Sequence, residues 1–382
     1  MSTENQSAYR NIMKATSLFG GVQVFKIIIA VVRSKVIAIL LGPMGMGIEG
    51  LLSSTTGLIS SITNFGLDIS AVRDVAAANE SNNSDRIARI IAVFRKLVWF
   101  TGLLGAVLTF VSASLLSELS FGNSDYTYAF MWLSATLFIN QLASGQNVLL
   151  QGLRKLKYLA KANLIGSSLS LVFSLPLYYF YGIDGIIPAM IISSLITFFF
   201  AWFYAKKIKV DKVKVSPKEV VSDGKSMLKM GVMLSLTSVI TVGASYIIRI
   251  YISQKGDLDD VGLYQAGFAI IFSYVGLVFN AMATDYYPKL SGVAKDTKKA
   301  IKLINQQAEI GLLILAPILT IFLVFINEIV IVLYSDQFVG VNEMIHWAAL
   351  GMYFKLASWV MAFLFLAKGH SKLFFWNELS FN

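Results

Sequence analysis

Residues 24–41 read VFKIIIAVVRSKVIAILL and run directly into GPMGMGIEGLL at residues 42–52. The first stretch is long and apolar enough to cross the hydrocarbon core of a bilayer, which takes about 20 helical residues. It nevertheless carries three basic residues, Lys26, Arg33 and Lys35. The glycines and proline of 42–47 indicate a tight turn rather than a nucleotide site. The segment therefore predicts a membrane helix that keeps charges within it, followed by a turn into a second helix.

The composition agrees with a protein surrounded mostly by lipid. Of 382 residues, 56% are hydrophobic and only 14% are charged, against roughly 25% charged in a typical soluble domain. This imbalance excludes a disordered chain, a nucleic-acid-binding domain and an ordinary cytosolic enzyme. The chain has no cysteine, which excludes disulfides, thiolate metal sites and cysteine nucleophiles.

Ten stretches are long and apolar enough to be membrane spans. The first is too long for a signal-peptide core, and no small-residue cleavage site follows it. An eleventh stretch begins near Lys372. The ten predicted spans are 15–41, 48–70, 98–118, 128–150, 160–180, 185–205, 230–253, 263–286, 307–333 and 341–366.

The basic residues between the spans indicate the orientation. The loop after the first span is counted as loop 1, so the even-numbered loops follow the second, fourth, sixth, eighth and tenth spans. The N-terminal tail and these even-numbered loops hold 26 Lys and Arg residues, whereas the odd-numbered loops hold one, Lys255. Because cytoplasmic loops are enriched in Lys and Arg, the N-terminus and even loops are predicted to be cytoplasmic. The net charge of +10 is therefore interpreted as a topology signal, and a nucleic-acid-binding patch is the disfavoured alternative.

Two of the predicted cytoplasmic loops have distinct patterns. Asp85–Leu97 places its apolar residues on one helical face, which predicts an amphipathic helix in the membrane interface whose bases attract anionic lipid. A plain connector is the alternative. Residues 206–229 form the longest and most basic loop, and this linker separates a predicted N-terminal lobe (1–205) from a C-terminal lobe (230–382).

The two halves resemble each other at a nearly constant offset. GIEGL at 47–51 corresponds to GLYQ at 262–265, a shift of 215 residues, and QGLRKL at 151–156 corresponds to KGHSKL at 368–373, a shift of 217. Two pairs of matching segments, far apart in the sequence, have nearly the same shift. This agreement predicts a parallel repeat of six spans per half. The second half lacks counterparts of roughly 166–205, so we expect a truncated version of a twelve-helix protein.

The common motifs of soluble enzymes are missing. Gly224-Lys225-Ser226 is similar to the end of a phosphate-binding loop, but residue 219 is Glu where the loop needs Gly. The only histidines, His346 and His370, have no ligand cluster nearby in the sequence, and no paired catalytic carboxylates are found. We therefore expect no catalytic site, no metal and no cofactor.

Charged residues inside the spans are the candidate binding residues, because each costs roughly 2.5–3.5 kcal/mol to insert. Lys26 and Arg33 are seven residues apart and share a helical face. Arg249 and Lys355 lie in the seventh and tenth spans. Facing inward, these four cations would bind a polyanion such as a phosphate or diphosphate. Snorkelling to the outer interface is the alternative for Lys35 and Arg249.

Several other polar residues also fall within the spans. Asp68 and Asp285 lie near the cytoplasmic ends of the second and eighth spans, where a carboxylate could pair with a base, couple to an ion or cap a helix. The fourth span contains four amides that either line a cavity or bridge helices. These amides are Asn140, Gln141, Gln146 and Asn147.

The N-terminal sequence resembles that of a known family. The matching stretches are KATSLFGGVQ at 14–23, RSK at 33–35, LLGPMGMG at 40–47, STTGLIS at 54–60 and NFG at 64–66. They are similar to the start of bacterial O-antigen translocases, in the polysaccharide-transporter branch of the multidrug/oligosaccharidyl-lipid/polysaccharide exporter superfamily. YGIDG at 181–185 resembles that superfamily's turn between spans five and six.

The resemblance implies an all-α integral membrane protein of MATE-like fold, with two six-helix lobes around a central cavity. It implies a transporter, not an enzyme, that flips an undecaprenyl-diphosphate-linked oligosaccharide to the outer leaflet of the bacterial inner membrane during lipopolysaccharide biosynthesis. Lys26, Arg33 and Arg249 match the family's cavity bases by helix and depth. Membrane lipid and polysaccharide polymerase machinery are the expected partners, and nucleic acid is not.

Two other functions compete with this interpretation. A cation-coupled multidrug exporter of the same fold favours carboxylates in its cavity, but the first span has three bases and no acid. A membrane polymerase or glycosyltransferase typically needs a sizeable extramembrane loop, and the longest odd loop is under about 20 residues.

Overall fold

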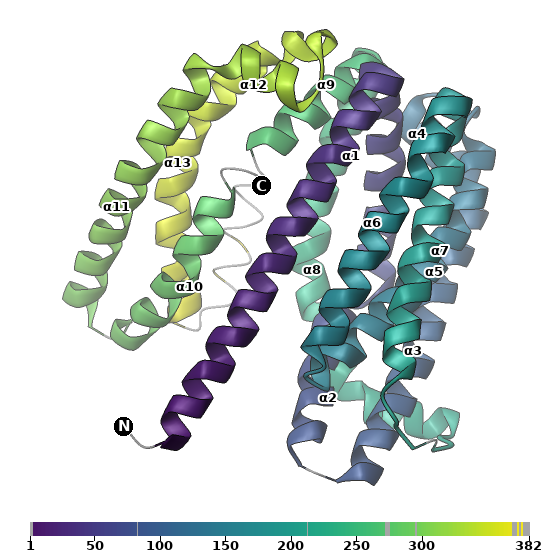
Figure 1. Cartoon of the computed structure of the whole chain (residues 1–382), viewed down its shortest axis with the longest axis vertical. Coiled ribbons are helices and arrows are strands. Elements are labelled where there is room, and N and C mark those ends of the chain that lie inside the picture. The colour runs from purple at the N-terminus through teal and green to yellow at the C-terminus, as the bar shows by residue number, and fades with distance from the viewer. Residues whose placement is uncertain are drawn as a thin grey trace. The chain divides into compact units, whose positions relative to one another are not determined.

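The computed structural model describes residues 3–368 apart from 82, 212, 272–275 and 295, together with residues 373 and 376. Most of these residues are helical, the others lie in turns and irregular loops, and no β-strand occurs among them. The eleventh span, predicted from near Lys372, lies almost wholly outside them. The helices (Figure 1) are α1 (Thr3–Thr63), α2 (Leu67–Glu80), α3 (Ser84–Val111), α4 (Ala113–Phe121), α5 (Thr127–Gly152), α6 (Leu156–Tyr181), α7 (Ile186–Lys206), α8 (Pro217–Lys255), α9 (Leu258–Ala269), α10 (Gly276–Val293), α11 (Thr297–Val324), α12 (Ile326–Leu333) and α13 (Asn342–Ala367), with short 3-10 turns η1 (Gly182–Gly185) and η3 (Asp336–Val341).

The turn predicted at Gly42-Pro43 is a break inside α1. Gly42 has φ 65° and ψ −168°, and Pro43 follows it directly. Glycine reaches this backbone conformation without steric cost. Proline lacks an N–H and has a fixed φ, so it suits the first position of a new helix. The two predicted spans at 15–41 and 48–70 are therefore two helices joined at one residue.

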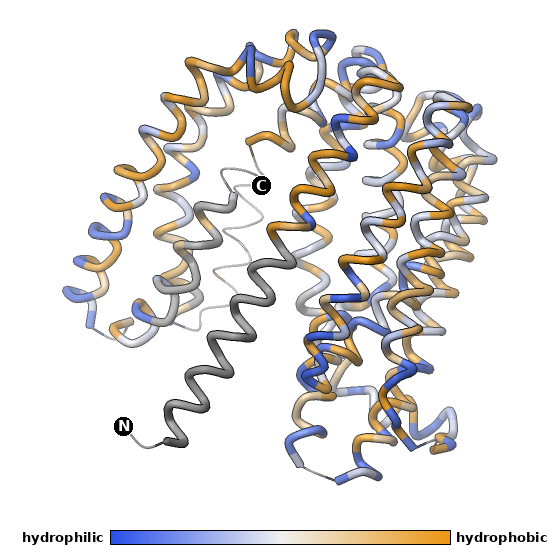
Figure 2. The backbone as a smooth tube through the Cα atoms, in the orientation of Figure 1, coloured by the Kyte–Doolittle hydropathy of each residue, from blue (hydrophilic) through white to orange (hydrophobic). Residues whose placement is uncertain are grey.

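Long apolar helices dominate the chain. By length and composition alone, four helical stretches among the described residues could cross a membrane. In the hydropathy view their middles are mostly hydrophobic, while hydrophilic residues gather toward helix ends and loops (Figure 2). The four stretches are Ser84–Val111, Leu156–Lys206, Thr297–Val324 and Asp336–Phe365.

The predicted amphipathic helix at 85–97 is not a separate interfacial element. It is the first half of α3, which continues as a single helix to Val111. Its apolar face packs into a protein core instead of facing lipid: Ile91, Phe94 and Leu97 are buried there. A helical stripe of apolar residues has the same sequence period whether it meets lipid or protein, which is why the sequence did not distinguish the two.

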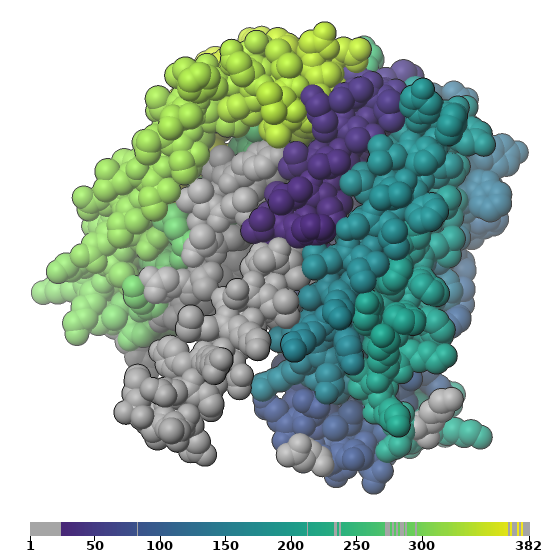
Figure 3. Space-filling model, in the orientation of Figure 1, coloured from purple at the N-terminus to yellow at the C-terminus, as the bar shows by residue number. Residues whose placement is uncertain are grey.

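The helices form two compact units. Unit 1 comprises Met1–Leu41 and Leu51–Gln254, and unit 2 comprises Gly42–Gly50 and Lys255–Asn382. In unit 1, α6 and α7 pack side by side, and α5 contacts both α3 and α7; side chains of α6 and α7 cover part of the face seen in Figure 3. These units differ from the predicted lobes, because residues 230–254 of α8 pack within unit 1. The division into a six-helix lobe at 1–205, a basic cytoplasmic linker at 206–229 and a lobe at 230–382 with four helices and the start of an eleventh stays a prediction.

The helix boundaries repeat along the chain. A shift of 215 residues carries α5, Thr127–Gly152, onto α13, Asn342–Ala367. A shift of 213 carries α3 onto α11, Thr297–Val324, and carries the break after α3 at Ser112 onto the break at Phe325. The N-caps correspond as well: Asn83 and Asp296 each accept a hydrogen bond from a backbone N–H three residues later. The period agrees with the one predicted from the sequence.

Two repeat-related glycines let helix backbones touch within unit 2. A Cβ atom on Gly47 would lie 2.0 Å from the carbonyl oxygen of Leu258, and a Cβ on Gly262 would lie 1.9 Å from that of Pro43. A shift of 215 residues carries Gly47 onto Gly262 and Pro43 onto Leu258, so each glycine contacts the repeat counterpart of the other's partner. The contact is therefore reciprocal, as at a local two-fold axis. No residue larger than glycine fits at either position.

A second glycine pair fixes α8 within unit 1. A Cβ on Gly231 would lie 2.0 Å from the carbonyl oxygen of Phe65, and one on Gly66, which has φ 60°, would lie 2.3 Å from the carbonyl oxygen of Gly231. Backbone approaches of this kind are common between helices in membranes, where small residues increase dispersion contact. The start of α2 therefore holds α8 at Gly231.

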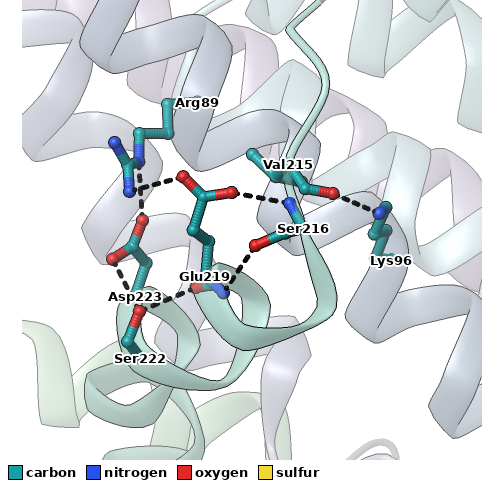
Figure 4. A network of polar contacts seen from close by, with 7 residues as sticks. All are labelled: Arg89, Lys96, Val215, Ser216, Glu219, Ser222 and Asp223. Carbon is teal, nitrogen blue, oxygen red and sulfur yellow. Dashed lines mark hydrogen bonds and ion pairs between the residues drawn. The ribbon is translucent and has the colours of Figure 1, made fainter.

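The basic linker is fixed to α3 by a polar network (Figure 4). Ser216 and Glu219 form a capping box: the Ser216 N–H donates to Glu219 Oε2 at 2.6 Å, and the Glu219 N–H donates to Ser216 Oγ at 3.3 Å. Arg89 on α3 pairs with Asp223 at 2.7 Å and with Glu219 at 3.3 Å. Lys96 donates to the carbonyl oxygen of Val215. These contacts set where α8 begins.

Replacing Gly47 or Gly262 by alanine should destabilise the protein by about 3 kcal/mol or more, because the new Cβ meets a backbone oxygen that no rotamer change can move. The midpoint of thermal unfolding in detergent measures this effect. Gly57→Ala is the matched control in the same helix, since no atom lies within 4 Å of its Cβ position. Equal midpoints for Gly47→Ala and Gly57→Ala would contradict the proposed close packing.

The linker contact should weaken at acidic pH. Hydrogen bonds from Ser216, and then the charge of Arg89, lower the pKa of Glu219. A lowered folded-state pKa means that the contribution of Glu219 is complete above its unfolded pKa, near 4.5, and is lost as pH falls through the folded value. The protection factors for hydrogen exchange of residues 206–216, which correct for the intrinsic pH dependence of amide exchange, should be constant from pH 7 to 5 and fall below about pH 4.5. In Glu219→Gln this fall should disappear; the same fall in that variant would refute the role of Glu219.

Candidate functional site

Arg33 is anchored by α6. Its Nη2 donates a hydrogen bond to Tyr178 Oη at 3.3 Å, and Tyr178 is a buried residue of α6. The guanidinium is half-buried. Since arginine offers five donors in a planar fork, this contact orients the group while leaving further donors for a ligand. The prediction that Arg33 lies inside the protein rather than at its rim fits this placement.

Arg249 is the most buried of the candidate cations, with 9% of its surface exposed. Its Nη1 donates to the carbonyl oxygen of Ser245 at 2.9 Å and to Ser245 Oγ, one turn earlier on α8. The helix ends six residues later, at Lys255, or about 9 Å along the axis. A buried guanidinium at this depth does not match the snorkelling alternative.

Lys26 lies on the same face of α1 as Arg33 and is half-buried. The two residues are seven positions apart, about 10 Å along the helix. Among the described residues Lys26 has no carboxylate within salt-bridge distance. Lys35, two residues after Arg33, projects about 160° away around the helix axis. Lys26 and Arg33 therefore form a short cationic row on one side of α1.

The four predicted cations do not all belong to one compact unit. Lys26, Arg33 and Arg249 are in unit 1, whereas Lys355 is an exposed residue of α13 in unit 2. The structure places three of the four within a single unit. Assembly of all four around one ligand stays a prediction.

An apolar groove lies beside the Arg33–Tyr178 contact. Its volume is about 470 Å³, and it runs between α1 and α6. Val36 and Leu40, three and seven residues after Arg33, contribute to its α1 wall. A cation next to an apolar groove suits an amphipathic ligand with an anionic group at one end and a hydrocarbon chain at the other. The lining residues are Val36, Ile39, Leu40, Leu175, Pro176, Tyr179 and Phe180.

The candidate carboxylates do not form a site in the described structure. Asp68 is exposed in the first turn of α2, where a negative charge complements the helix dipole. Its position fits the capping alternative. The side chain of Asp285, in α10, lies outside the described part. No cluster of three or more His, Asp or Glu residues that could hold a metal occurs among the described residues.

Of the amides of the fourth predicted span, one bridges helices, and none is shown to line a cavity that contains the candidate cations. Gln141 bridges helices: its Nε2 donates to Asn64 Oδ1 at 3.1 Å and to Thr101 Oγ1 at 2.9 Å. Gln146 lines a cavity. Asn140 is exposed, and the Oδ1 atom of Asn147 is buried without a hydrogen-bond partner in the described structure.

Sequence reasoning missed Tyr178 and Ser245, the neutral polar residues that accept hydrogen bonds from the cations, and a buried network next to Ser245. Thr55, Ser120 and Tyr246 form a buried chain of hydrogen bonds across three helices, with distances of 3.1 and 2.8 Å. Tyr246 follows Ser245, the residue that holds Arg249. Hydroxyls are common in membrane helices and give no periodic signal. A tyrosine within an apolar stretch, as at 178 and 246, was the one available clue.

Comparison with known proteins identifies the family of this chain. Residues 36–343 match the family described as polysaccharide biosynthesis protein. The Lipid III flippase of Escherichia coli (strain K12) is 19% identical over 347 residues, which cover 91% of this chain and 83% of that protein.

Solved structures show the same fold. An inward-facing multidrug resistance MATE family transporter of the MOP superfamily superimposes with a TM-score of 0.75 at 15% identity, covering 93% of this chain and 83% of that chain. An outward-facing structure of such a transporter gives 0.62 at 15% identity, covering 96% and 85%. The predicted all-α MATE-like fold is thereby confirmed. The chain belongs to the polysaccharide biosynthesis protein family and is an all-α membrane protein of the MATE fold.

Proposed function

We propose that the protein flips a lipid-linked oligosaccharide across the bacterial inner membrane, and that Lys26, Arg33, Arg249 and Lys355 bind the diphosphate of that lipid. The family and the flippase named among its relatives support transport of this class of substrate. The observation that carries the site assignment is Arg33, which lies within an apolar helix, held by Tyr178 and next to an apolar groove.

The charge pattern of α1 fits an anionic substrate. Lys26 and Arg33 lie on one face of an apolar helix, where two cations are costly unless they serve a ligand. Arginine and lysine bind phosphate oxygens through charge-assisted hydrogen bonds, which strengthen where water is excluded. A diphosphate bound along this row would offset the cost of keeping both cations in the helix.

The apolar groove fits the other end of such a substrate. A polyprenyl chain is hydrocarbon, and the groove between α1 and α6 has walls of leucine, isoleucine and aromatic residues. Occupation by a prenyl segment would place the diphosphate near Arg33. The undecaprenyl-diphosphate-linked O-antigen of lipopolysaccharide biosynthesis is the specific substrate we propose, delivered from the cytoplasmic leaflet with the N-terminus cytoplasmic.

Transport would follow alternating access. Two lobes related by an internal repeat can rock about a shared axis and expose a site to each side in turn. The reciprocal contact of Gly47 and Gly262 supports the assignment of a local two-fold axis there. We propose that the two predicted lobes rotate about this crossing, that no covalent chemistry occurs, and that polysaccharide polymerase machinery receives the product.

Replacing Lys26 or Arg33 by alanine should reduce O-antigen transport about 10- to 100-fold, since a charge-assisted hydrogen bond contributes roughly 1.5–3 kcal/mol. Complementation of a translocase-deficient strain, followed by quantification of surface polysaccharide, measures this transport. Lys35→Ala is the matched control, because it removes a cation from another side of α1. Unchanged polysaccharide in Lys26→Ala/Arg33→Ala would refute the site assignment.

The multidrug-exporter alternative makes a separate prediction. Cells that express the protein should show the same dye efflux and drug susceptibility as cells with an empty vector, because α1 offers cations rather than carboxylates to a cationic drug. Fluorescent-dye efflux with a MATE transporter as positive control measures this. Clear efflux that depends on the proton or sodium gradient would favour the exporter over the flippase.

A further inference from the structure

A basic cavity lies in unit 1, and none of the residues assigned to the transported diphosphate lines it. Its volume is about 570 Å³, and it is bounded by α3, α5, α7 and the loop that follows α7. The lining comprises three cations, one amide, three aromatic residues and several aliphatic ones. These residues are Arg95, Trp99, Leu142, Gln146, Phe198, Trp202, Ala205, Lys206, Ile208, Lys209 and Val210.

Within the described residues, no anionic partner is found for the cations of this cavity. Arg95, Lys206 and Lys209 take part in no ion pair within the described structure, and no Asp or Glu lines the cavity. This differs from neighbouring bases on the same elements. Arg89 is paired with Glu219 and Asp223, and Lys96 donates to the backbone of Val215. Three positive charges converging without compensation favour a bound anion.

The residues around these cations pack against the rest of unit 1. On the loop after α7, Ile208 and Val210 pack against the hydrophobic cluster of unit 1, and exposed Lys209 lies between them. Lys206 lies over the ring of Trp202, with its Nζ 4.9 Å from the ring centroid. Trp99 packs edge-on against Phe138 at 5.0 Å. The cavity is therefore built before a ligand arrives, which lowers the entropic cost of binding.

The location matches a membrane–water boundary. Helix α7 has 21 residues, about 30 Å of helix, which is the thickness of the hydrocarbon core. Lys206 ends this helix, and Trp202 lies one turn before the end. Tryptophan followed by lysine at a helix end is the usual arrangement at the level of lipid headgroups. The side is the one where basic loops predict the cytoplasm.

We propose that this cavity binds the headgroup of an anionic phospholipid from the adjacent leaflet. Arg95, Lys206 and Lys209 contact the lipid phosphate, Gln146 donates to a headgroup oxygen, and Trp99 and Trp202 border the glycerol region. Phe198 and Leu142 meet the first methylenes of an acyl chain. The bound lipid ties α3, α5 and α7 together at the end of the bundle where the linker begins.

Native mass spectrometry of the purified protein in detergent tests this proposal, with phosphatidylglycerol as the anionic lipid and phosphatidylethanolamine as the zwitterionic one. Wild-type protein should retain one phosphatidylglycerol more tightly than any phosphatidylethanolamine. The triple variant Arg95→Gln/Lys206→Gln/Lys209→Gln should lose about a hundredfold in affinity for that lipid. The single variant Lys209→Gln should lose about fivefold.

A matched control variant removes three positive charges from a surface outside the cavity. Lys155→Gln/Lys157→Gln/Lys161→Gln changes three exposed lysines around the start of α6, none of which lines the cavity. This control should bind phosphatidylglycerol as the wild type does. An equal loss in both triple variants would mean that overall charge, not the cavity, holds the lipid, and would overturn the proposal.

Two competitors distinguish the source of the phosphate. Inorganic phosphate at millimolar concentration should leave the bound phosphatidylglycerol in place; its displacement would show a free-anion site instead. Undecaprenyl diphosphate at equimolar concentration should also fail to displace it. Displacement by that lipid would assign the cavity to the transported substrate and overturn the proposal. Wild-type binding by the cavity triple variant would overturn it as well.

Discussion

The contact between the backbones at Gly47 and Gly262 is the constraint on which much of this fold depends. Water is absent from the membrane interior, so helices there associate through close packing rather than through the hydrophobic effect. A side chain at either position would place a carbon within about 2 Å of a carbonyl oxygen. The break at Gly42-Pro43 brings residues 43–50 into this contact, and so it joins the second part of α1 to α9 within unit 2.

The sequence predicted well those secondary-structure elements that depend on neighbouring residues alone. Apolar length predicted helices such as α5, α6, α7 and α13 nearly to their ends, and Gly42-Pro43 predicted the turn in α1. The predicted span 263–286 was less accurate, because the helix after Leu258 changes to a wider turn at 270–271 before α10 begins. Such a change depends on packing, and no proline marks it.

Long-range contacts were harder to predict. Arg33 could be singled out because a charge in an apolar helix is conspicuous, but its partner Tyr178 is 145 residues away. The amphipathic stretch at 85–97 was wrongly assigned to the lipid interface, since the core it meets includes Val215 of the distant linker. The linker was recognised only as the longest and most basic loop, yet Glu219 and Asp223 bind it to Arg89. Local sequence patterns indicate which residues need a packing or polar partner, but they do not identify that partner when it is distant in the sequence.

The reciprocal form of the glycine contact has a consequence for how such a chain could have arisen. Because Gly47 meets Leu258 as Gly262 meets Pro43, and the repeat exchanges these pairs, the surface is complementary to itself. A gene encoding one repeat would make a polypeptide whose two copies associate as a symmetric homodimer through the same glycine. Duplication and fusion of that gene would then preserve an interface that already existed, and each half could afterwards diverge around it.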